Sequence, residues 1–514
     1  VREGSRLAFG SYSNTVYHFD KANVVVSLGS DFLDDGPGHL RYARDFSSRR
    51  KVRKGSTSMN RLYSIESSPS PTGSLADHRL AVKPSQIEGY ARAIAAALGL
   101  GAEGGTTENA PWIAALARDL QANRGAAIVV PGEDQPPAVH AIAHAINQAL
   151  GSIGTAVTIT ESAEAAPVNQ LESLRALVTD MNAGKVKTLV MFGGNPVFDS
   201  PADFHFRDAL IKVPFRVHLS PYYDETSMLA HWHIPETHFL ETWSDGRAHD
   251  GTVSIQQPLI APLYNGRSAL EVLGALIGGL DASPYDTVRN YWMAKSGAGL
   301  AFDNTWRKWL NDGVIANSAL PAKAVTASLA IPAPATRNPQ PATTLELQLR
   351  HDPTIYDGRF ANNGWLQELP KPQTKIVWEN VLLVGPATAE RLNIRPSDGM
   401  VNEKTTWLVE LDYRGQRIEV PVWIIPGQAA DTLTLTYGYG REQAGHIGND
   451  IGVNAYRIRF SDALHGSAGA NVRNTNRDYE VACTQEHQNI ELGGEREIVR
   501  AGTFAEWQHN PSLK

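Results

Sequence analysis

A short glycine-containing turn is the first part of this sequence that could bind a ligand. It directly follows the apolar run Thr188 to Phe192, which is typical of a strand. The turn consists of Gly193, Gly194, Asn195 and Pro196, with Asp199 and Ser200 at its far end. Glycines let a ligand approach the backbone, and the N-terminus of a following helix offers free N–H groups to a phosphate. The turn therefore predicts a nucleotide-binding site, with an ordinary strand-to-helix connection as the alternative.

The residues after the turn predict the start of a helix. Ser200 is a favourable N-cap, Pro201 suits the first helical position, and Asp203 could complete the cap. We expect this helix to continue to Ile211.

A histidine-rich segment offers a second kind of chemistry. The segment HWHIPETHFLE contains His231, His233, His238, Glu236 and Glu241. Neutral imidazoles with a carboxylate could bind zinc and activate a water, which makes a metal-dependent hydrolase using His231, His233 and Glu236 one hypothesis. However, His231 and His233 alternate along a short strand and no separate third ligand is identifiable. A polar strand end at a domain interface is the alternative.

Cys483 is the only cysteine in the 514 residues. A cubane iron–sulfur cluster needs about four thiolates, so this chain cannot hold one by itself. It also cannot form an internal disulfide or a Cys-rich zinc site. His487 lies four residues later, but a Cys–His nucleophile pair would lack an orienting residue. We therefore expect Cys483 to be an ordinary small residue.

Three further motifs favour structural roles or leave the choice open. Gly99, Gly101 and Gly104 match G-x-G-x-x-G, but they follow a helix instead of a strand, which favours a helix C-cap and loop. The basic stretch from Arg41 to Lys54 favours a solvated helix face over a phosphate-binding surface. The segment from Asp357 to Glu368 suits either a buried connection or the wall of a ligand cleft.

Composition narrows the class of protein. Hydrophobic residues make up 42% and charged residues 20%, as in ordinary globular proteins. The net charge of −7 argues against a nucleic-acid partner. No apolar run reaches the roughly 18 residues of a membrane span, and the length suggests about three domains. The chain begins at Val1 without a signal-peptide pattern, so we expect a fragment or a processed chain.

The order of the expected elements predicts an α/β body followed by a barrel. Short strands and helices alternate from residue 127 to residue 219, which predicts a doubly wound parallel sheet whose ligands bind beyond the carboxyl ends of the strands. A Pro/Ala-rich linker is expected over Leu320 to Thr343. Strands with a hairpin turn at Tyr413 to Gln416 then predict a small β-barrel, and a polar, extended tail is expected from about Ala470.

Several blocks of sequence resemble known proteins. The block GGNPVFDSPADFHFRDAL after the Thr188–Phe192 strand resembles the guanine-nucleotide-binding domain of the molybdopterin oxidoreductases of the dimethyl-sulfoxide-reductase superfamily. PATAERLNIRPSDGMV and GNDIGVNAY resemble the C-terminal double-psi barrel of that superfamily. FLDDGPGHLRYARDFSSRR, DGRFANNGWLQELPKPQTKIVWEN and the tail TQEHQNIE resemble one branch more closely, the B subunit of bacterial alternative complex III.

The resemblance implies a domain plan. It comprises a partial α/β domain (1–110), a Rossmann-like, nucleotide-binding-like domain (111–319), a linker (320–375), a double-psi-like barrel (376–469) and a tail (470–514). The tail would lead to a missing ferredoxin-like half that holds iron–sulfur clusters, while this half would hold no cofactor.

The leading hypothesis is accordingly a structural, non-catalytic part of a quinol-oxidising respiratory complex. Its partners would be haem c and quinol-oxidising membrane subunits, on the periplasmic side of the bacterial inner membrane. The main alternative is a catalytic subunit with a molybdopterin guanine dinucleotide cofactor, in which the turn from Gly193 to Ser200 would bind a guanine nucleotide.

Overall fold

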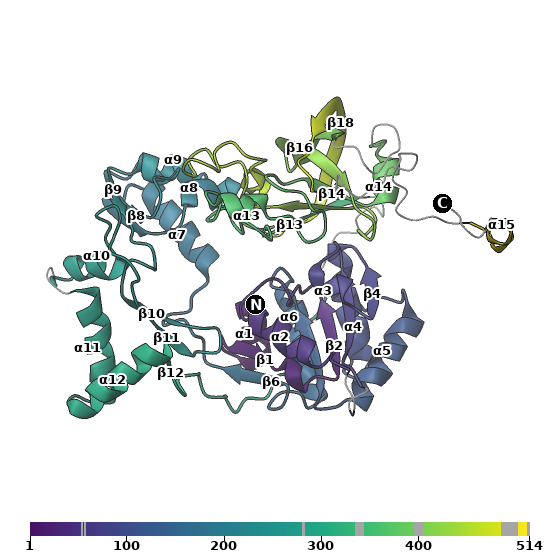
Figure 1. Cartoon of the computed structure of the whole chain (residues 1–514), viewed down its shortest axis with the longest axis horizontal. Coiled ribbons are helices and arrows are strands. Elements are labelled where there is room, and N and C mark those ends of the chain that lie inside the picture. The colour runs from purple at the N-terminus through teal and green to yellow at the C-terminus, as the bar shows by residue number, and fades with distance from the viewer. Residues whose placement is uncertain are drawn as a thin grey trace.

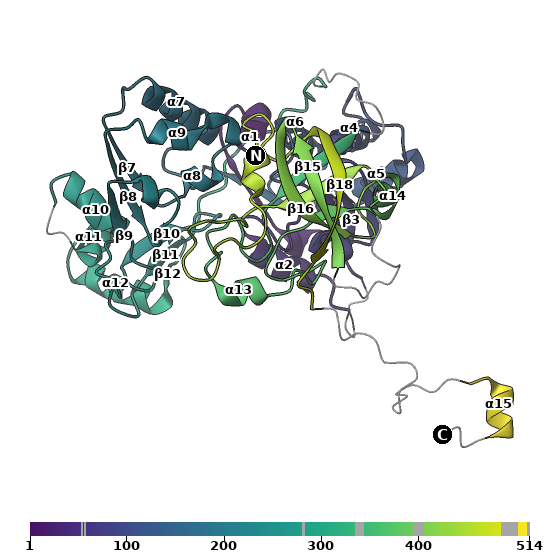
Figure 2. The ribbon, with the colours of Figure 1, turned by 90° about the horizontal axis from the view of Figure 1, so that it is seen from above.

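A computed structural model describes residues 1–52, 55, 58–279, 283–334, 344–394, 405–484 and 502–510. Figure 1 shows a β-barrel above one α/β unit and beside a second one on the left, and Figure 2 shows the same arrangement from above. None of the helices in these ranges is long and apolar enough to cross a membrane. The short helix α15 (Phe504–His509) lies apart from the three units.

The first unit contains a four-stranded parallel sheet in the order β4-β3-β2-β5. Its strands are β2 (Val24–Leu28), β3 (Arg61–Glu66), β4 (His78–Ala81) and β5 (Ala127–Pro131). Its helices are α1 (Arg2–Phe9), α2 (His39–Ser48), α3 (Pro71–Ser74), α4 (Ile87–Ala97), α5 (Ala110–Ala122) and α6 (Pro137–Ala149). Every residue of β2 is buried, because α4, α5 and α6 cover one face of the sheet and α2 covers the other.

The second unit contains a three-stranded parallel sheet in the order β7-β8-β9. The strands are β7 (Thr188–Phe192), β8 (Phe215–Ser220) and β9 (Trp232–Pro235), with helices α7 (Gln170–Asn182), α8 (Pro196–Asp199) and α9 (Phe206–Leu210). Helices α7 and α9 pack on one face through Val178, Met181 and Leu210. An attached subdomain contains β10 (Ser244–Arg247), β11 (Val253–Gln256), β12 (Val314–Ile315), α10 (Ala269–Leu276), α11 (Pro284–Ser296) and α12 (Leu300–Asp312).

The strands that the sequence presents as one alternating series belong to three different sheets. Strand β5 pairs with β2, while β6 (Val157–Thr160) pairs antiparallel with β1 (Asn14–Tyr17). Only β7 and β8 of this series are neighbours. Local alternation identifies strands and helices, but it does not encode which strands pair.

The barrel is closed, with strand order β13-β17-β14-β16-β15-β18. Its strands are β13 (Leu345–Arg350), β14 (Leu382–Val384), β15 (Thr405–Tyr413), β16 (Gln416–Ile424), β17 (Thr432–Thr436) and β18 (Ala468–Glu480), with helices α13 (Gly364–Glu368) and α14 (Pro386–Arg391). The predicted hairpin is present, since Tyr413 pairs with Gln416 across a turn in which Arg414 and Gly415 have positive φ angles of 53° and 80°.

Two barrel strands lie outside the limits expected from the sequence. Strand β13 precedes residue 376, and most of β18 follows residue 469, where a polar tail was expected. Most residues of β18 are polar and at least partly exposed, yet its backbone pairs with β15 over nine positions. The bulk of the predicted tail motif, residues 485–501, lies outside the described residues.

Candidate functional site

The glycine turn follows β7 at the carboxyl end of its sheet, as expected from the sequence. Gly193 and Gly194 have left-handed φ angles of 61° and 70°, which favour glycine. The N–H of Gly193 donates to the carbonyl oxygen of Leu219 at 2.8 Å, which ties the turn to β8. The turn faces the barrel.

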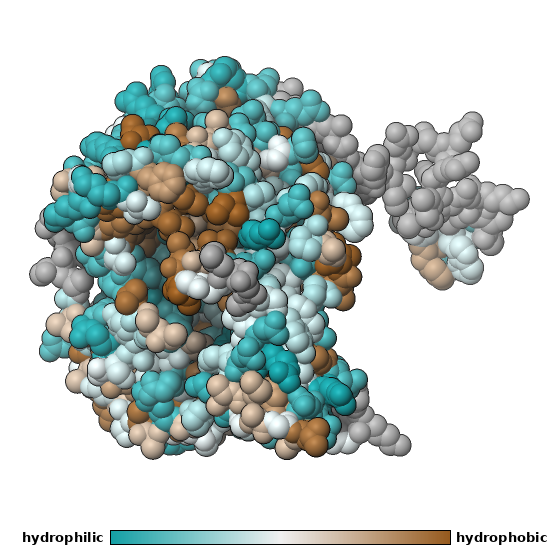
Figure 3. All heavy atoms as spheres, turned by 90° about the vertical axis from the view of Figure 1, so that its left-hand side faces the viewer, coloured by the Kyte–Doolittle hydropathy of each residue, from teal (hydrophilic) through white to brown (hydrophobic). Residues whose placement is uncertain are grey.

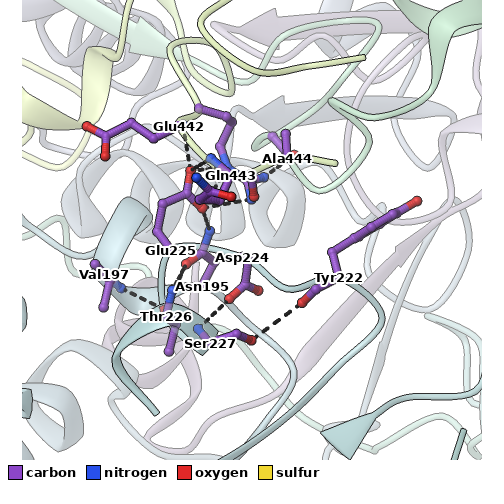
Figure 4. Close-up of polar contacts among 12 residues, drawn as sticks. Asn195, Val197, Tyr222, Asp224, Glu225, Thr226, Ser227, Glu442, Gln443 and Ala444 are labelled. Atoms are coloured by element: carbon purple, nitrogen blue, oxygen red, sulfur yellow. Dashed lines mark hydrogen bonds and ion pairs between the residues drawn. The ribbon is translucent and has the colours of Figure 1, made fainter. Parts of the chain in front are cut away.

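The side chain of Asn195 makes three hydrogen bonds to neighbouring protein groups (Figure 4). Its Nδ2 donates to Glu225 Oε2 at 2.6 Å, and its Oδ1 accepts from the N–H and the hydroxyl of Thr226 at 3.1 and 2.7 Å. The Thr226 hydroxyl also accepts the N–H of Val197 at 3.1 Å, in the first turn of α8. Pro196 precedes Val197 and has no N–H of its own.

Glu225 joins this turn to the barrel through a buried ion pair with Arg441. The guanidinium contacts both carboxylate oxygens at 2.9–3.1 Å, and the N–H groups of Glu442 and Gln443 donate to Oε1 at 2.8 and 3.0 Å. Arg441 also donates to the carbonyl of Gly358 at 2.8 Å. We refer to Asn195, Glu225, Thr226 and Arg441 as the junction cluster.

The charge of Glu225 is stabilised by this arrangement. Burial alone would raise the pKa of Glu225, but hydrogen bonds and the positive charge of Arg441 outweigh it and hold the pKa below its ordinary value. Arg441 also stacks over the ring of Phe198, 4.9 Å from its centroid. The cluster is therefore a satisfied polar core between the second unit and the barrel.

The predicted helix start at Ser200 is wrong. Ser200 follows α8 as its C-cap, and its hydroxyl donates back to the carbonyl of Pro196 at 2.5 Å. The segment to Ile211 is divided by His205, which has a φ of 47°, into a 3-10 turn (Ala202–Phe204) and α9. Asp203 caps nothing and accepts from Ser461 of the barrel instead. Contacts with a distant segment override the local capping signal.

Asp199 is the turn residue with the most perturbed ionisation. Burial, followed by the nearby carboxylate of Asp357, raises its pKa from 3.8 to about 7. Arg459 of the barrel donates to the Asp199 backbone carbonyl at 3.2 Å and opposes the shift. A carboxyl group that changes charge near neutral pH thus lies beside the junction cluster.

The histidines do not converge on one point. His231 Nδ1 accepts the N–H of Arg216 at 3.1 Å, whereas His233 Nδ1 lies 3.0 Å from the hydroxyl of Ser227. Among the described residues, no group of three His, Cys, Asp or Glu side chains is arranged to hold a metal ion. The hydrolase hypothesis, which needs His231, His233 and Glu236 together, therefore has no geometric support.

The sequence did not reveal a buried polar network beneath the turn. His218 Nδ1 lies 2.8 Å from the Ser227 hydroxyl, and Asp224 accepts the Ser227 N–H at 2.8 Å. These side chains resemble a hydrolytic triad in type, but Ser227 and His218 have no exposed surface. They support the loop that carries Glu225 and Thr226.

A cavity of about 650 Å³ lies elsewhere, between the first unit and the barrel. The loops after β2 and β3 line one wall through Asp31, Asp34 and Pro69. Barrel residues that include Phe360 and Lys371 line the opposite wall. None of the residues from Gly193 to Ser200 contributes to it. Ligands of parallel sheets bind beyond the carboxyl ends of the strands. The cavity lies at this end of the β2 and β3 strands and not at the end of β7.

The segment from Asp357 to Glu368 performs both roles that the sequence left open. Asn362 accepts the N–H groups of His446 and Ile447, and Gln367 donates to the carbonyl of Ala361, as in a buried connection. Arg359, Phe360 and Leu366 of the same segment line the cavity.

Two ionisable pairs lie at the cavity wall and edge. The ammonium group of Lys371 donates to the Tyr439 hydroxyl at 2.8 Å and lies 3.6 Å from the carboxylate of Asp352. Burial lowers the pKa of Lys371, and the Asp352 charge opposes that effect. At the cavity edge, His351 of the barrel lies 3.7 Å from Asp35 of the first unit.

The architecture defines a class of protein. A mixed α/β structure with parallel sheets and a closed six-stranded barrel is consistent with a molybdopterin-oxidoreductase-like fold. The structure is similar to acetylene hydratase from Pelobacter acetylenicus, with a TM-score of 0.65 over 92% of this chain and 80% of that one, at 13% sequence identity. This similarity concerns the fold alone.

One curated relative shows sequence similarity. Over 297 residues the chain is 25% identical to the menaquinone reductase, molybdopterin-binding-like subunit, of Nitratidesulfovibrio vulgaris strain Hildenborough. The aligned stretch covers 53% of this chain and 38% of that subunit. No protein-family model matches the chain. The molybdopterin-oxidoreductase superfamily fits both similarities.

Proposed function

We propose that this chain is a structural, cofactor-free, molybdopterin-oxidoreductase-like part of an iron–sulfur subunit in a respiratory quinol:electron-acceptor oxidoreductase of the alternative complex III type. The junction cluster is the observation that carries the proposal. Asn195 is the turn residue best suited to hydrogen-bond a nucleotide. Its side-chain amide instead hydrogen-bonds Glu225 and Thr226.

The turn is a poor match for a guanine nucleotide. The N–H of Val197 is taken by Thr226, and Pro196 has none. Burial raises the pKa of Asp199 to about 7, so its carboxyl group is a weak anionic acceptor for a base edge. A nucleotide that used the side chain of Asn195 would compete with its hydrogen bonds to Glu225 and Thr226.

The relative supports the wider setting. Its name joins a molybdopterin-binding-like subunit to a menaquinone reductase, which favours a quinone-linked complex for this chain. On this proposal the second unit is a nucleotide-binding-like domain and the barrel is of the double-psi type. Haem c and quinol-oxidising membrane subunits are its partners on the periplasmic side, and the iron–sulfur clusters lie in a ferredoxin-like half.

Metal and pterin analysis of the intact, purified complex tests the proposal. We expect iron in the complex but neither molybdenum nor guanine nucleotide in proportion to this chain. Stoichiometric molybdenum and guanine nucleotide that remain with this chain through purification would refute the structural role.

The cavity favours a second candidate, a catalytic subunit with a molybdopterin guanine dinucleotide cofactor. A volume of about 650 Å³ suits one ligand of moderate size, at the edge where parallel sheets bind ligands. A bound pterin would supply the redox chemistry, and the loops after β2 and β3 would hold it. Extraction of a pterin in proportion to this chain would favour this candidate.

A further inference from the structure

The second unit carries an unusual concentration of exposed apolar side chains. Nearly half of the large apolar side chains exposed in the described residues lie between Phe192 and Ile277. Within this stretch the most exposed side chains are Ile277, Tyr264 and Leu259, at 86, 80 and 76%. Figure 3 shows apolar residues gathered on the side of the molecule where this unit lies. Isolated exposed apolar residues are ordinary, but a gathering of this kind marks an interaction site.

Backbone hydrogen bonds hold these residues next to one another. The N–H groups of Leu259 and Ile260 both donate to the carbonyl of Leu240, beside Phe239. The N–H of Arg267 donates to Pro235 at the end of β9, and α10 begins directly afterwards. We call the resulting surface the apolar face; it consists of Trp232, Phe239, Leu259, Ile260, Leu263, Tyr264, Leu273, Leu276 and Ile277.

Helix α10 is well formed, but its apolar side is only partly covered by the subdomain. A capping box between Ser268 and Glu271 fixes its start. Its sequence, ALEVLGAL, has one charged residue, yet none of its residues is buried. A short helix in water gains most of its stability by packing an apolar side against a neighbour. Leu270 packs against the core of the subdomain, whereas Leu273 and Leu276 remain 45 and 60% exposed. This uncovered part of the helix is suited to receive a further neighbour.

The charge of the apolar face identifies the kind of neighbour. The stretch 257–279 has only two charged side chains, Arg267 and Glu271, and they lie 3.8 Å apart. Glu241 beside it accepts the N–H groups of His238 and Leu263. A helix that binds an anionic lipid surface carries lysine and arginine on its polar side, which this one lacks. A neutral, aromatic-rich surface is typical of the core of a permanent protein interface.

We infer that the apolar face is the docking surface for a partner subunit that presents an uncharged, apolar surface of its own. The inference rests on the proposed function, which requires partner subunits but assigns them no surface. Covering α10 and the loop 259–264 would bury side chains that no other described part of the chain covers.

The test uses a double variant in the intact complex. Leu259→Lys with Ile277→Lys places two charges on the apolar face. Leu40→Lys with Leu75→Lys adds the same charge at exposed positions of the first unit, 78 and 55% exposed, and serves as the matched control. Each replaces the native gene, and native electrophoresis with an antibody against this chain measures the fraction in the large assembly. We expect the face variant to lose at least about 10-fold of its assembled fraction, and the control to match the wild type.

Other outcomes separate the failures. A face variant that stays assembled overturns the docking surface and leaves the proposed function standing, whereas a wild-type chain found in no assembly overturns the proposed function. If the purified wild-type chain dimerises and the face variant does not, the occupant of the apolar face is a second copy. If the wild-type chain binds neutral phosphatidylcholine vesicles and the face variant does not, the occupant is lipid. A thermal midpoint equal to that of the wild type confirms that the face variant is folded. If the lysine pair does not fold, Leu259→Ser with Ile277→Ser replaces it, and this pair should also lower the assembled fraction.

Discussion

The barrel meets the two parallel-sheet units in different ways. At the β7 end, the junction cluster fills the contact with a buried ion pair whose hydrogen bonds are satisfied on both sides. At the β2 and β3 ends, the barrel and the sheet leave a cavity of about 650 Å³. The same kind of sheet edge is thus closed at one junction and open at the other.

The difference shows that a sequence motif typical of ligand binding and a cavity large enough for a ligand need not occur at the same place. The glycine turn has the residue types of a nucleotide site, but the Asn195 side chain and the N–H of Val197 are hydrogen-bonded within the protein. The cavity follows loops without a recognisable nucleotide motif, yet it has room for a ligand. In a structural subunit, protein contacts that close the junction at β7 are useful because they stabilise the arrangement of the second unit and the barrel.

Removing Arg441 tests the closed junction most strongly. Arg441→Ala leaves Glu225 buried without its partner, and we expect the free energy of unfolding to fall by about 3–5 kcal/mol. Denaturant titration of the purified chain measures it.

A double variant separates the unpaired charge from lost packing. Arg441→Met combined with Glu225→Gln removes both charges and keeps a side-chain oxygen to accept the N–H groups of Glu442 and Gln443, so it should recover part of the lost stability. If Arg441→Ala costs less than about 1 kcal/mol, the pair is solvated and the junction is not closed.

Asn195→Ala gives the second-largest expected effect. It leaves Glu225 and Thr226 each short of a hydrogen bond, which should cost about 1–3 kcal/mol. Thermal unfolding with and without added guanine nucleotide distinguishes the two roles of Asn195. Nucleotide that raises the midpoint of the wild type but not of the variant would show that the turn reads a ligand instead of closing the junction.

Local parts of this arrangement could be predicted from sequence. The apolar run Thr188 to Phe192, the turn after it and the hairpin at Arg414–Gly415 each depend on neighbouring residues, and the structure confirms them. Strand β18 could not be predicted, because its polar residues are held by pairing with β15 and not by their own pattern.

The role of the turn depends on residues far along the chain. The sequence indicates Asn195 from its position after a strand, but nothing near it indicates Glu225 or Arg441. The prediction of a helix start at Ser200 is wrong for the same reason. Asp203 accepts a hydrogen bond from Ser461 of the barrel and does not cap the helix. Local capping and turn signals decide local conformation, whereas long-range contacts decide which groups remain free for a ligand.

The ionisation of Asp199 gives a smaller, pH-dependent effect. Because folding raises its pKa from 3.8 to about 7, the folded state holds the proton more tightly, and stability falls as the pH rises through this window. Asp199→Asn removes the charge, so at pH 8 it should be more stable than the wild type by on the order of 1–2 kcal/mol, after allowance for partial exposure. At pH 4 the difference should shrink. Unfolding titrations at both pH values check this, and a variant that is less stable at pH 8 would contradict it.

The open junction should tolerate truncation best. Leu366 borders the cavity and is only half-buried, so Leu366→Ala should lower the free energy of unfolding by less than about 1 kcal/mol. Leu349, which has no exposed surface in the barrel core, is the matched control, and Leu349→Ala should cost about 2–5 kcal/mol. Denaturant titration compares the two. Equal losses would mean that the cavity wall is packed as tightly as the core, and the contrast between an open and a closed junction would then fail.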